Sequence, residues 1–438
     1  MRRLRSLREH VRVSLWFLPA LFALGAVLLA FSLLAVDHQL SGNASLFFLY
    51  GGTAEGARSV LSTIAQSMLT FTGLVFTITM LVLQLASTQL SPRVMRTFLR
   101  DRSNQAVLGL FVATFVYTLL VLRDVRAGVD GDDAFVPGLS IWVGFALLLA
   151  SVAAFIYYID HMANAIRAST VIANIARETE QAIERLYPEP VGAPGAEEPR
   201  VKIEDADVVL KSPRAGTLVS VDDGKILRTA GGGDRRVHVL PAVGDFLPLG
   251  APLARLSGRW DREGADAVRD ALGIEDERSL EQDAAFGFRQ LVDIAVRALS
   301  PGTNDPTTAV QALDRLHDLL RRLALREIPS PVRRDGSAQV RLVLPRPSWD
   351  DYVELTIDEI RLAGERQIQI GRRLRYLLED LLLVAPDERK AVLRRELALL
   401  ESAVQRSFRD SADVALAGSP SARGHATAAP SGRTAGSR

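Results

Sequence analysis

Four long runs without Asp, Glu, Lys or Arg constrain the fold of this 438-residue chain more than any other feature. They extend over residues 13–36, 59–92, 103–122 and 134–159. A helix needs about 20 apolar residues to cross roughly 30 Å of hydrocarbon. The first run has 24 residues and so exceeds the apolar stretch of about 7–15 residues in a cleavable signal peptide. We therefore predict an α-helical membrane domain with four transmembrane helices.

The arginines beside these runs predict how the helices are oriented. Five lie before the first run, four lie between the second and third, and Arg167 and Arg177 follow the fourth. The remaining two loops carry only Arg58, and Arg123 with Arg126. Because Lys and Arg are retained on the cytoplasmic side of a membrane, we expect a multi-pass protein with both termini in the cytoplasm.

The composition excludes several classes of function. Lys and Arg number 52 against 51 Asp and Glu, so no nucleic acid partner is expected. The chain has no cysteine, which excludes disulfides, thiolate metal sites and cysteine nucleophiles. The six histidines are far apart and in no ligand spacing, so we expect no metal and no cofactor. No nucleophile elbow, phosphate loop or dinucleotide motif is present, and we expect no enzyme activity.

The second run carries polar and small side chains that recur mostly three, four or seven residues apart, which places them on one face of a helix. This polar stripe, our set of candidate pore-lining residues, consists of Ser62, Gln66, Thr70, Gly73, Thr77 and Gln84. The stripe has two interpretations. Small and polar residues let membrane helices pack closely, or they line a water-filled path in an oligomer with one helix per subunit.

None of the four runs contains Asp, Glu, Lys, Arg or His, and charged residues occur only in the segments beside them. Coupled transporters usually place such a residue within the membrane, so coupled transport is disfavoured, and an uncharged path would be weakly selective. The loop after the third run carries Asp124, Asp130, Asp132 and Asp133. These acids are either a solvated loop or, in an oligomer, a ring that concentrates cations.

The rest of the chain predicts a cytoplasmic α+β region. The predicted divisions are a basic N-terminus (1–12), the membrane domain (13–160), a linking helix with a Pro-rich linker (161–200), a small β domain (201–258), a mainly helical domain (259–410) and a disordered tail (411–438). Within the β domain, SPRAGTLVSVD and VGDFLPLGAPLARL resemble the barrel-sandwich units of biotinyl and lipoyl domains, in swapped order. No lysine there has the setting of a carrier lysine, so no cofactor attachment is expected.

The helical domain contains the densest polar pattern of the chain. We expect a helix from about Leu280 to Leu299, a corner at SPGTND, and a second helix with Asn304 or Asp305 as its cap and Pro306 in its first turn. This corner is either a ligand or subunit contact, since N–H groups at a helix start can bind an anion, or only a tight turn with its caps. Candidate contact residues are Asp283, Gln290, Asp293, Arg297, Ser300, Asn304 and Asp305.

Two segments, AFGFRQLVDIAVRALSPGTNDPTTAVQALDRL and FTGLVFTITMLVLQLASTQLSPR, closely resemble the bacterial predicted membrane proteins classed as domain of unknown function 2254. The resemblance extends over roughly residues 10–405. It implies a protein of the bacterial inner (plasma) membrane, and it supplies no catalytic residues. Asp160-His161 differs from the paired histidines that the family has at this position, which argues against a metal role.

From these features we expect a homo-oligomeric, channel-like protein in the lipid bilayer that conducts a small ion, with the cytoplasmic region as an assembly or gating domain. The alternative is a membrane-anchored sensor or scaffold, whose cytoplasmic domain binds an unknown ligand or a protein partner.

Overall fold

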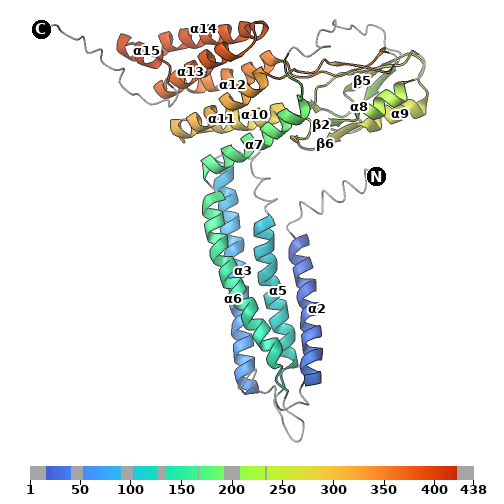
Figure 1. Ribbon diagram of the computed structural model, residues 1–438, viewed down its shortest axis with the longest axis vertical. Helices are drawn as coiled ribbons and strands as arrows, with labels where there is room; N and C mark the ends of the chain where they lie inside the picture. The colour runs from blue at the N-terminus through green and yellow to red at the C-terminus, as the bar shows by residue number, and fades with distance from the viewer. Residues whose placement is uncertain are drawn as a thin grey trace, which may run out of the picture. The chain divides into compact units, whose positions relative to one another are not determined.

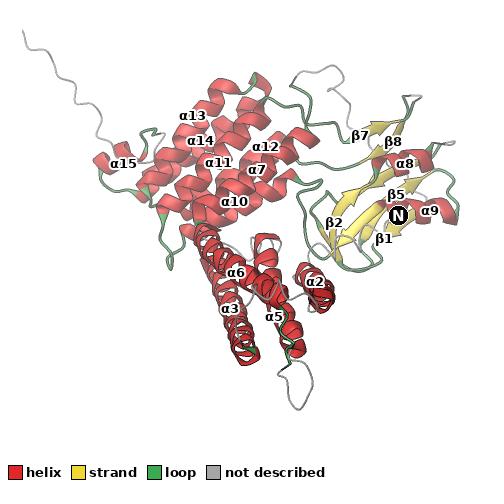
Figure 2. Cartoon of the chain, turned by 60° about the horizontal axis from the view of Figure 1, so that its bottom comes forward, coloured by secondary structure: helices red, strands yellow, loops and turns green. Residues whose placement is uncertain are grey.

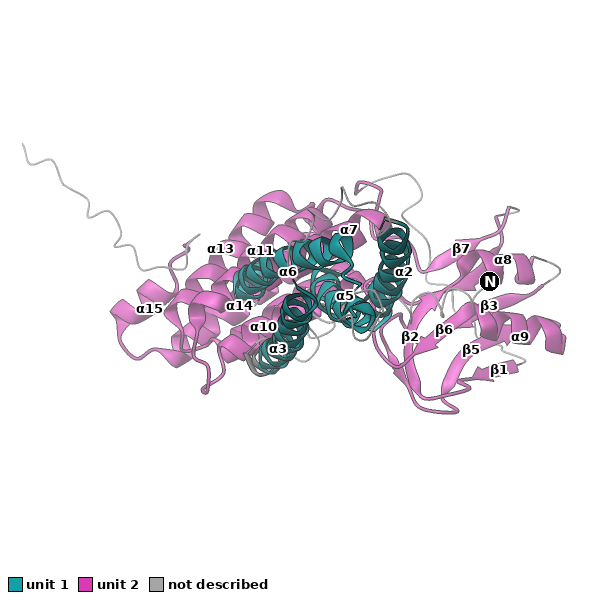
Figure 3. Ribbon diagram, turned by 90° about the horizontal axis from the view of Figure 1, so that it is seen from below, with its two compact units in different colours: residues 1–170 teal, residues 171–438 magenta. Residues whose placement is uncertain are grey.

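The computed structural model describes residues 16–40, 53–89, 102–126, 135–165, 167–191, 208–231, 234–336 and 338–421. The chain divides into two compact units, residues 1–170 and residues 171–438, which are coloured separately in Figure 3. The first unit holds four long apolar helices, and the second is an α+β region with small sheets and helices (Figure 1). The sequence prediction of four apolar helices followed by an α+β region is confirmed at this level.

The four helices of the first unit are each long and apolar enough to cross a membrane. They are α2 (Phe17–Leu40), α3 (Ala54–Gln89), α5 (Arg102–Asp124) and α6 (Gly138–Ala165). Helix α5 packs against all three others. Its side chains Phe111, Tyr117 and Val121 are fully buried, and Phe111 lies near the stacked rings of Phe71 on α3 and Phe155 on α6.

Polar bonds fasten the helices at one end of this bundle. The carboxylate of Asp37, near the end of α2, accepts from the N–H groups of Leu139 and Ser140 at 3.1 and 3.0 Å, and from the Ser140 hydroxyl at 2.6 Å. It therefore caps the start of α6. At the same end Arg58 of α3 donates to the carbonyl of Val125 at 2.9 Å. The ends of α2 and α5 thus meet the starts of α3 and α6, so the four helices alternate in direction.

The linking helix that we predicted from residue 161 onward is two helices. Helix α6 continues to Ala165, and α7 (Ala168–Leu186) begins three residues later. The N–H of Arg167 bonds to the carbonyl of Asn164, three residues back, which tightens and ends the turn. Hydrophobic periodicity continues through both helices and did not indicate this break.

Two small sheets form the β part of the second unit. The five-stranded sheet has the order β1-β5-β3-β8-β7, and the three-stranded sheet has the order β4-β2-β6. The strands are β1 (Val208–Lys211), β2 (Gly216–Val221), β3 (Arg236–Val239), β4 (Phe246–Leu247), β5 (Pro252–Ser257), β6 (Leu272–Glu275), β7 (Val332–Arg334) and β8 (Val340–Val343).

Both sheets and the helices α8 (Asp223–Ala230) and α9 (Arg262–Ala271) share one hydrophobic core. Leu218, Val237 and Leu342 are fully buried in it. Strand β8 pairs in parallel with β3, although about 100 residues separate them in the sequence. The five-stranded sheet therefore draws on residues from both sides of position 258. The domain boundaries that we placed from composition stay predictions.

The remaining helices form the helical part of the second unit. They are α10 (Ala284–Ala298), α11 (Pro306–Ala324), α12 (Trp349–Ala363), α13 (Ile368–Val384), α14 (Lys390–Ser407) and α15 (Ser411–Ala417), with a 3-10 turn at Asp387–Arg389. After α11 the chain forms β7 and β8 and then α12, α13 and α14. Our disordered tail from residue 411 is wrong for its first residues, because 411–417 form α15 and pack against α13. Residues 422–438 lie outside the described part.

A glycine sets how closely α10 approaches α7. A Cβ at Gly287 would overlap the side chain of Thr179, which is fully buried. Only a residue without a side chain fits there. Gly302, in the corner after α10, has open space around it.

We predict that Gly287→Ala lowers the stability of the folded protein by about 2 kcal/mol, because overpacking outweighs the higher helix propensity of alanine. Thermal unfolding of the detergent-purified protein measures this as a lower melting temperature. Gly302→Ala is the matched control and should leave the melting temperature nearly unchanged. Equal melting temperatures for Gly287→Ala and the original chain would contradict the packing.

Candidate functional site

The polar stripe of α3 faces away from its own bundle. Gln66, Thr70, Gly73, Thr77 and Gln84 are exposed, and Ser62 is half-buried. A Cβ added at Gly73 would meet nothing within 4 Å. The opposite face of α3 is buried against the bundle through Leu61, Ile64, Met68, Val75 and Val82. The stripe thus belongs to the outer surface of the subunit.

The two threonine hydroxyls of the stripe are bonded within α3 itself. Thr70 donates to the carbonyl of Gln66 at 3.0 Å, and Thr77 donates to the carbonyl of Gly73 at 2.9 Å. Threonines bonded to the carbonyl four residues back are tolerated in apolar surroundings, because donor and acceptor are both satisfied. These threonines therefore need no partner outside the helix.

Gln66 differs from the threonines of the stripe. Its side chain is exposed, and its carboxamide makes no hydrogen bond to any described residue. Gln66 lies eight residues after Arg58, the last charged residue of α3, which corresponds to about 12 Å along the helix axis. For a hydrocarbon layer of about 30 Å, this position is inside the span.

Other polar side chains of the bundle are bonded between helices. The Tyr158 hydroxyl on α6 bonds to Thr79 on α3 at 2.8 Å and donates to the carbonyl of Val75 at 3.0 Å. The Thr114 and Ser151 hydroxyls, from α5 and α6, are 3.1 Å apart. The contrast with these pairs makes the unbonded amide of Gln66 the most informative group in the membrane half.

The SPGTND corner is closed by its own hydrogen bonds. The N–H groups of Thr303 and Asn304 bond to the carbonyl of Ser300, and the N–H of Asp305 bonds to the carbonyl of Ala298. Asp305, and not Asn304, caps α11 by accepting from the N–H of Thr308 at 3.1 Å. Since these N–H groups and the helix start are already occupied, the corner offers little to an anion.

The backbone of Asn304 is in the left-handed region with φ of 45°. Asn304 tolerates this conformation better than most residues. Its side-chain oxygen accepts from Gln367 at 3.1 Å, which joins the α10–α11 corner to the α12–α13 corner. The corner thus has a clear structural role, and its predicted role as a ligand or subunit contact stays a prediction.

The other predicted contact residues do not meet at one site. Asp283 is the N-cap of α10, so the helix begins after it and not at Leu280 as we predicted. The corner lies at the opposite end of α10, whose 15 residues span about 22 Å. Gln290 is buried between them, Asp293 pairs with Arg289 at 2.7 Å, and Arg297 is exposed.

Asp283 is the most deeply buried acid of this set. Its carboxylate accepts from Arg278 at 2.7 and 2.9 Å and from the N–H of Phe286 at 3.0 Å. Burial raises the pKa of Asp283, and the neighbouring Arg278 guanidinium opposes this effect. Its two roles, as helix cap and as partner of Arg278, are structural.

A buried polar cluster between α11 and α13 was not indicated by the sequence. The two ring nitrogens of His317 lie 2.9 Å from the Asp380 carboxylate and 3.0 Å from the Arg373 guanidinium. Burial and Arg373 lower the pKa of His317, so the ring is neutral near pH 7. Because more than 50 residues separate these partners in sequence, no local spacing pointed to the cluster. Among the residues described, no group of three or more His, Asp or Glu is arranged to hold a metal ion.

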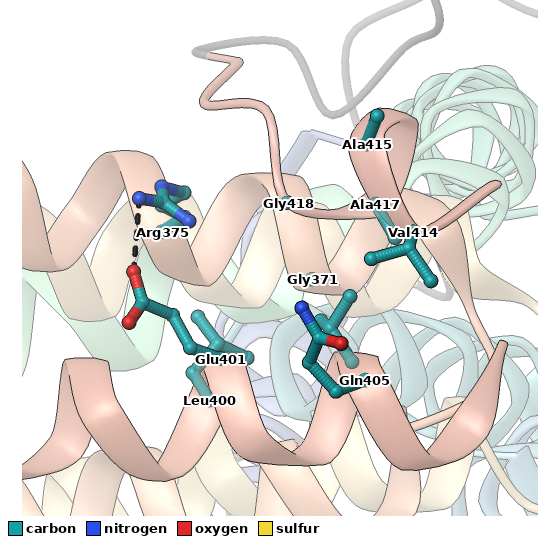
Figure 4. A pocket seen from close by; sticks show the side chains of 10 residues that line it. Gly371, Arg375, Leu400, Glu401, Gln405, Val414, Ala415, Ala417 and Gly418 are labelled. Carbon is teal, nitrogen blue, oxygen red and sulfur yellow. Dashed lines mark ion pairs between the residues drawn. The ribbon is translucent and has the colours of Figure 1, made fainter. Parts of the chain in front are cut away.

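A pocket of about 280 Å³ lies between α13, α14 and α15 (Figure 4). Arg375 and Glu401 form an ion pair of 3.0 Å at its side, and Gln405 points toward the space. Leu400, Val404 and Val414 supply the apolar lining. The sequence did not indicate this pocket, because part of its wall is α15, which we had assigned to the disordered tail.

A buried acid on α14, Glu396, gives the second unit a measurable pH dependence. Glu396 is 1% exposed. Burial and the nearby Asp358 raise its pKa above the ordinary value of 4.5, while Arg361 opposes them. A carboxyl group with a raised pKa in the folded state destabilises that state when ionised. Its unfavourable contribution therefore grows as the pH rises from about 4.5 through the raised pKa.

We predict that Glu396→Gln increases the free energy of unfolding at pH 7 by about 1 kcal/mol, and that the gain disappears below pH 4.5. Melting temperatures of the two proteins between pH 4 and 8 measure the difference. Glu401→Gln, which changes a half-exposed acid on the same helix, should show no comparable trend. A Glu396→Gln protein less stable than the original chain at pH 7 would rule out this account.

Comparison with known proteins finds a family model and relatives that each match most of the chain. The family model described as "Predicted membrane protein (DUF2254)" matches residues 12–380. Proteins described as uncharacterized in Mycobacterium bovis and in Mycobacterium tuberculosis strain H37Rv are each 34% identical to the chain over 424 residues. These alignments cover 95% of this chain and 81% of each relative. No solved structure matches the chain.

Proposed function

Because the chain belongs to the DUF2254 family of predicted membrane proteins, we propose that it is a homo-oligomeric, channel-like protein in which α3 of each copy lines a path for a small ion. The second unit, whose two sheets we interpret as a barrel-sandwich-like domain, would serve assembly or gating. The observation that carries the proposal is the exposed amide of Gln66, which has no hydrogen bond to a described residue and lies within a candidate span.

An amide in hydrocarbon without a hydrogen bond is costly, by about 4–8 kcal/mol relative to water. No described residue of the same chain bonds to the Gln66 carboxamide, so the surroundings of the subunit must supply a partner. Two sources satisfy it, namely the stripe of another copy or water between copies. Either source requires that α3 faces another copy of the chain and not lipid.

Water between the copies is favoured by the length of the stripe. The exposed stripe continues from Gln66 to Gln84, which is about 27 Å along the helix. A single polar residue would suffice to fix the register of two packed helices. A polar row that continues from Gln66 through the rest of the span is what a water-filled path needs, and its lack of charge agrees with weak selectivity.

The proposed location is the bacterial inner membrane with both termini in the cytoplasm. The alternating directions of the four helices put the start of α2 and the end of α6 at the same end of the bundle. The arginines that flank the spans favour the cytoplasm for that end. The second unit follows α6 and would then be cytoplasmic.

The flux through reconstituted protein tests the proposal directly. We predict that Gln66→Leu reduces ion flux into liposomes by about tenfold, since a barrier higher by about 1.4 kcal/mol lowers a rate tenfold. Leu74→Met changes an exposed residue of α3 about 80° around the helix from Gln66, and it should leave flux unchanged. Light scattering confirms that each variant assembles to a mass above one chain of 47.7 kDa.

Unchanged flux in a folded and assembled Gln66→Leu protein would remove Gln66 from the path. No flux from intact oligomers under voltage or osmotic challenge would favour the alternative, a membrane-anchored sensor or scaffold. The pocket between α13, α14 and α15 supports that alternative, because it is large enough for a small ligand and combines an ion pair with apolar walls.

A further inference from the structure

Strand β1 forms one border of the five-stranded sheet, which Figure 2 shows among the strands of the second unit. In the part of the chain that the structure describes, β1 pairs with β5 on one side and with no strand on the other. A strand at the border of a sheet directs alternate N–H and C=O groups outward, where they can pair with another strand.

Exposed apolar side chains gather along this border. Val208 and Val209 of β1 are 38% and 45% exposed, and Leu249, in the turn before β5, is 71% exposed. We call these three residues the β1 edge. Leu249 lies beside the end of β1, because the neighbouring Gly250 donates its N–H to the carbonyl of Ser212 at 2.9 Å.

The β1 edge differs from the rest of the second unit. Elsewhere among its described residues, large exposed apolar side chains occur singly on separate elements, and these are Phe246 on β4, Leu325, Leu362, Leu383 and Leu399. Single exposed apolar residues are normal on any protein, whereas a gathered set marks an interaction surface. The open backbone ladder indicates that the partner supplies a β-strand.

We propose that the β1 edge is a subunit contact, in which β1 pairs antiparallel with β1 of a second copy of this chain across a twofold axis. The two five-stranded sheets then form one continuous sheet. The contact lies in the second unit and is separate from the α3 stripe, but the choice of a second copy as partner rests on the homo-oligomer of the proposed function.

The sequence of β1 is complementary to itself in this arrangement. With the pairing centred on Val209, this residue faces Val209 of the second copy, and Val208 faces Leu210 of the second copy. Residues 208 and 210 lie on the same face of the strand, as an antiparallel pair requires. Leu210 is 2% exposed in the core of its own unit, so the second copy would extend that core over Val208.

Pairing of this kind needs a partner at high local concentration, because a ladder of four residues is weak by itself. Two copies assembled in one membrane through α3 provide that concentration. A lipid surface would cover the apolar side chains but would leave the outward N–H and C=O groups of β1 without ladder partners. A β-strand covers the apolar side chains and also pairs with the outward N–H and C=O groups. A contact between two identical edges is complete with two copies and adds no further copies.

The chain has no cysteine, so a single introduced cysteine reports this contact cleanly. We expect Val209→Cys, purified as the full chain and reconstituted into liposomes, to form a disulfide-linked pair of twice 47.7 kDa under mild oxidation. Opposed residues of antiparallel strands have Cα atoms about 4.5–5.5 Å apart, which suits a disulfide. Leu383→Cys, at a side chain 84% exposed on α13, is the control for random collision and should link at least about tenfold more slowly.

Equal rates of linking for Val209→Cys and Leu383→Cys would overturn the contact. If Val209→Cys lowers the melting temperature, Val208→Cys with a short bismaleimide replaces it, because the diagonal distance between the two copies is about 7–8 Å. Gln66→Cys, tested in parallel, separates this inference from the proposed function. Linking at residue 66 alone removes the β1 contact and keeps the α3 assembly, whereas linking at residue 209 alone does the reverse.

Discussion

Hydrocarbon supplies no hydrogen-bond partner, and this constraint governs how the polar groups of the first unit are placed. The carboxylate of Asp37 accepts hydrogen bonds at the start of α6, and the hydroxyl of Tyr158 bonds to α3. The threonines of the α3 stripe turn to their own backbone. Gln66 is the contrasting case, because its amide finds no partner among the described residues. An assembled state that supplies this partner follows from the same constraint.

In the second unit, buried charged side chains are paired with neighbouring side chains of opposite charge or bonded to them. Asp283 is paired with Arg278 at the start of α10, and His317 lies between Asp380 and Arg373. Removing one partner of such a network strongly lowers the stability of the folded state, since the charge left behind remains buried without an opposite charge. The pocket beside α15 and the open border at β1 are built from other residues than these networks.

The sequence predicted the elements that depend on local patterns. Uncharged runs indicated the four helices, and Pro306 indicated the start of α11, whose cap the sequence left open between Asn304 and Asp305. Periodicity grouped the α3 stripe but did not say which way it faces, because both faces of α3 are largely apolar. Contacts between distant segments, such as the parallel pairing of β8 with β3 and the His317 cluster, carry no local signal. Helix α15 was missed since its short apolar pattern gains stability only by packing on α13.

Exposure of Gln66 to water in the assembled protein can be measured by the reaction of introduced cysteines with a membrane-impermeant thiol reagent. We predict that a cysteine at position 66 is modified in liposomes, whereas a cysteine at Met68, which is fully buried on the opposite face of α3, is not. An unreactive cysteine at position 66 in an assembled protein would contradict a water-filled path along α3, and the stripe would then be a dry contact between helices.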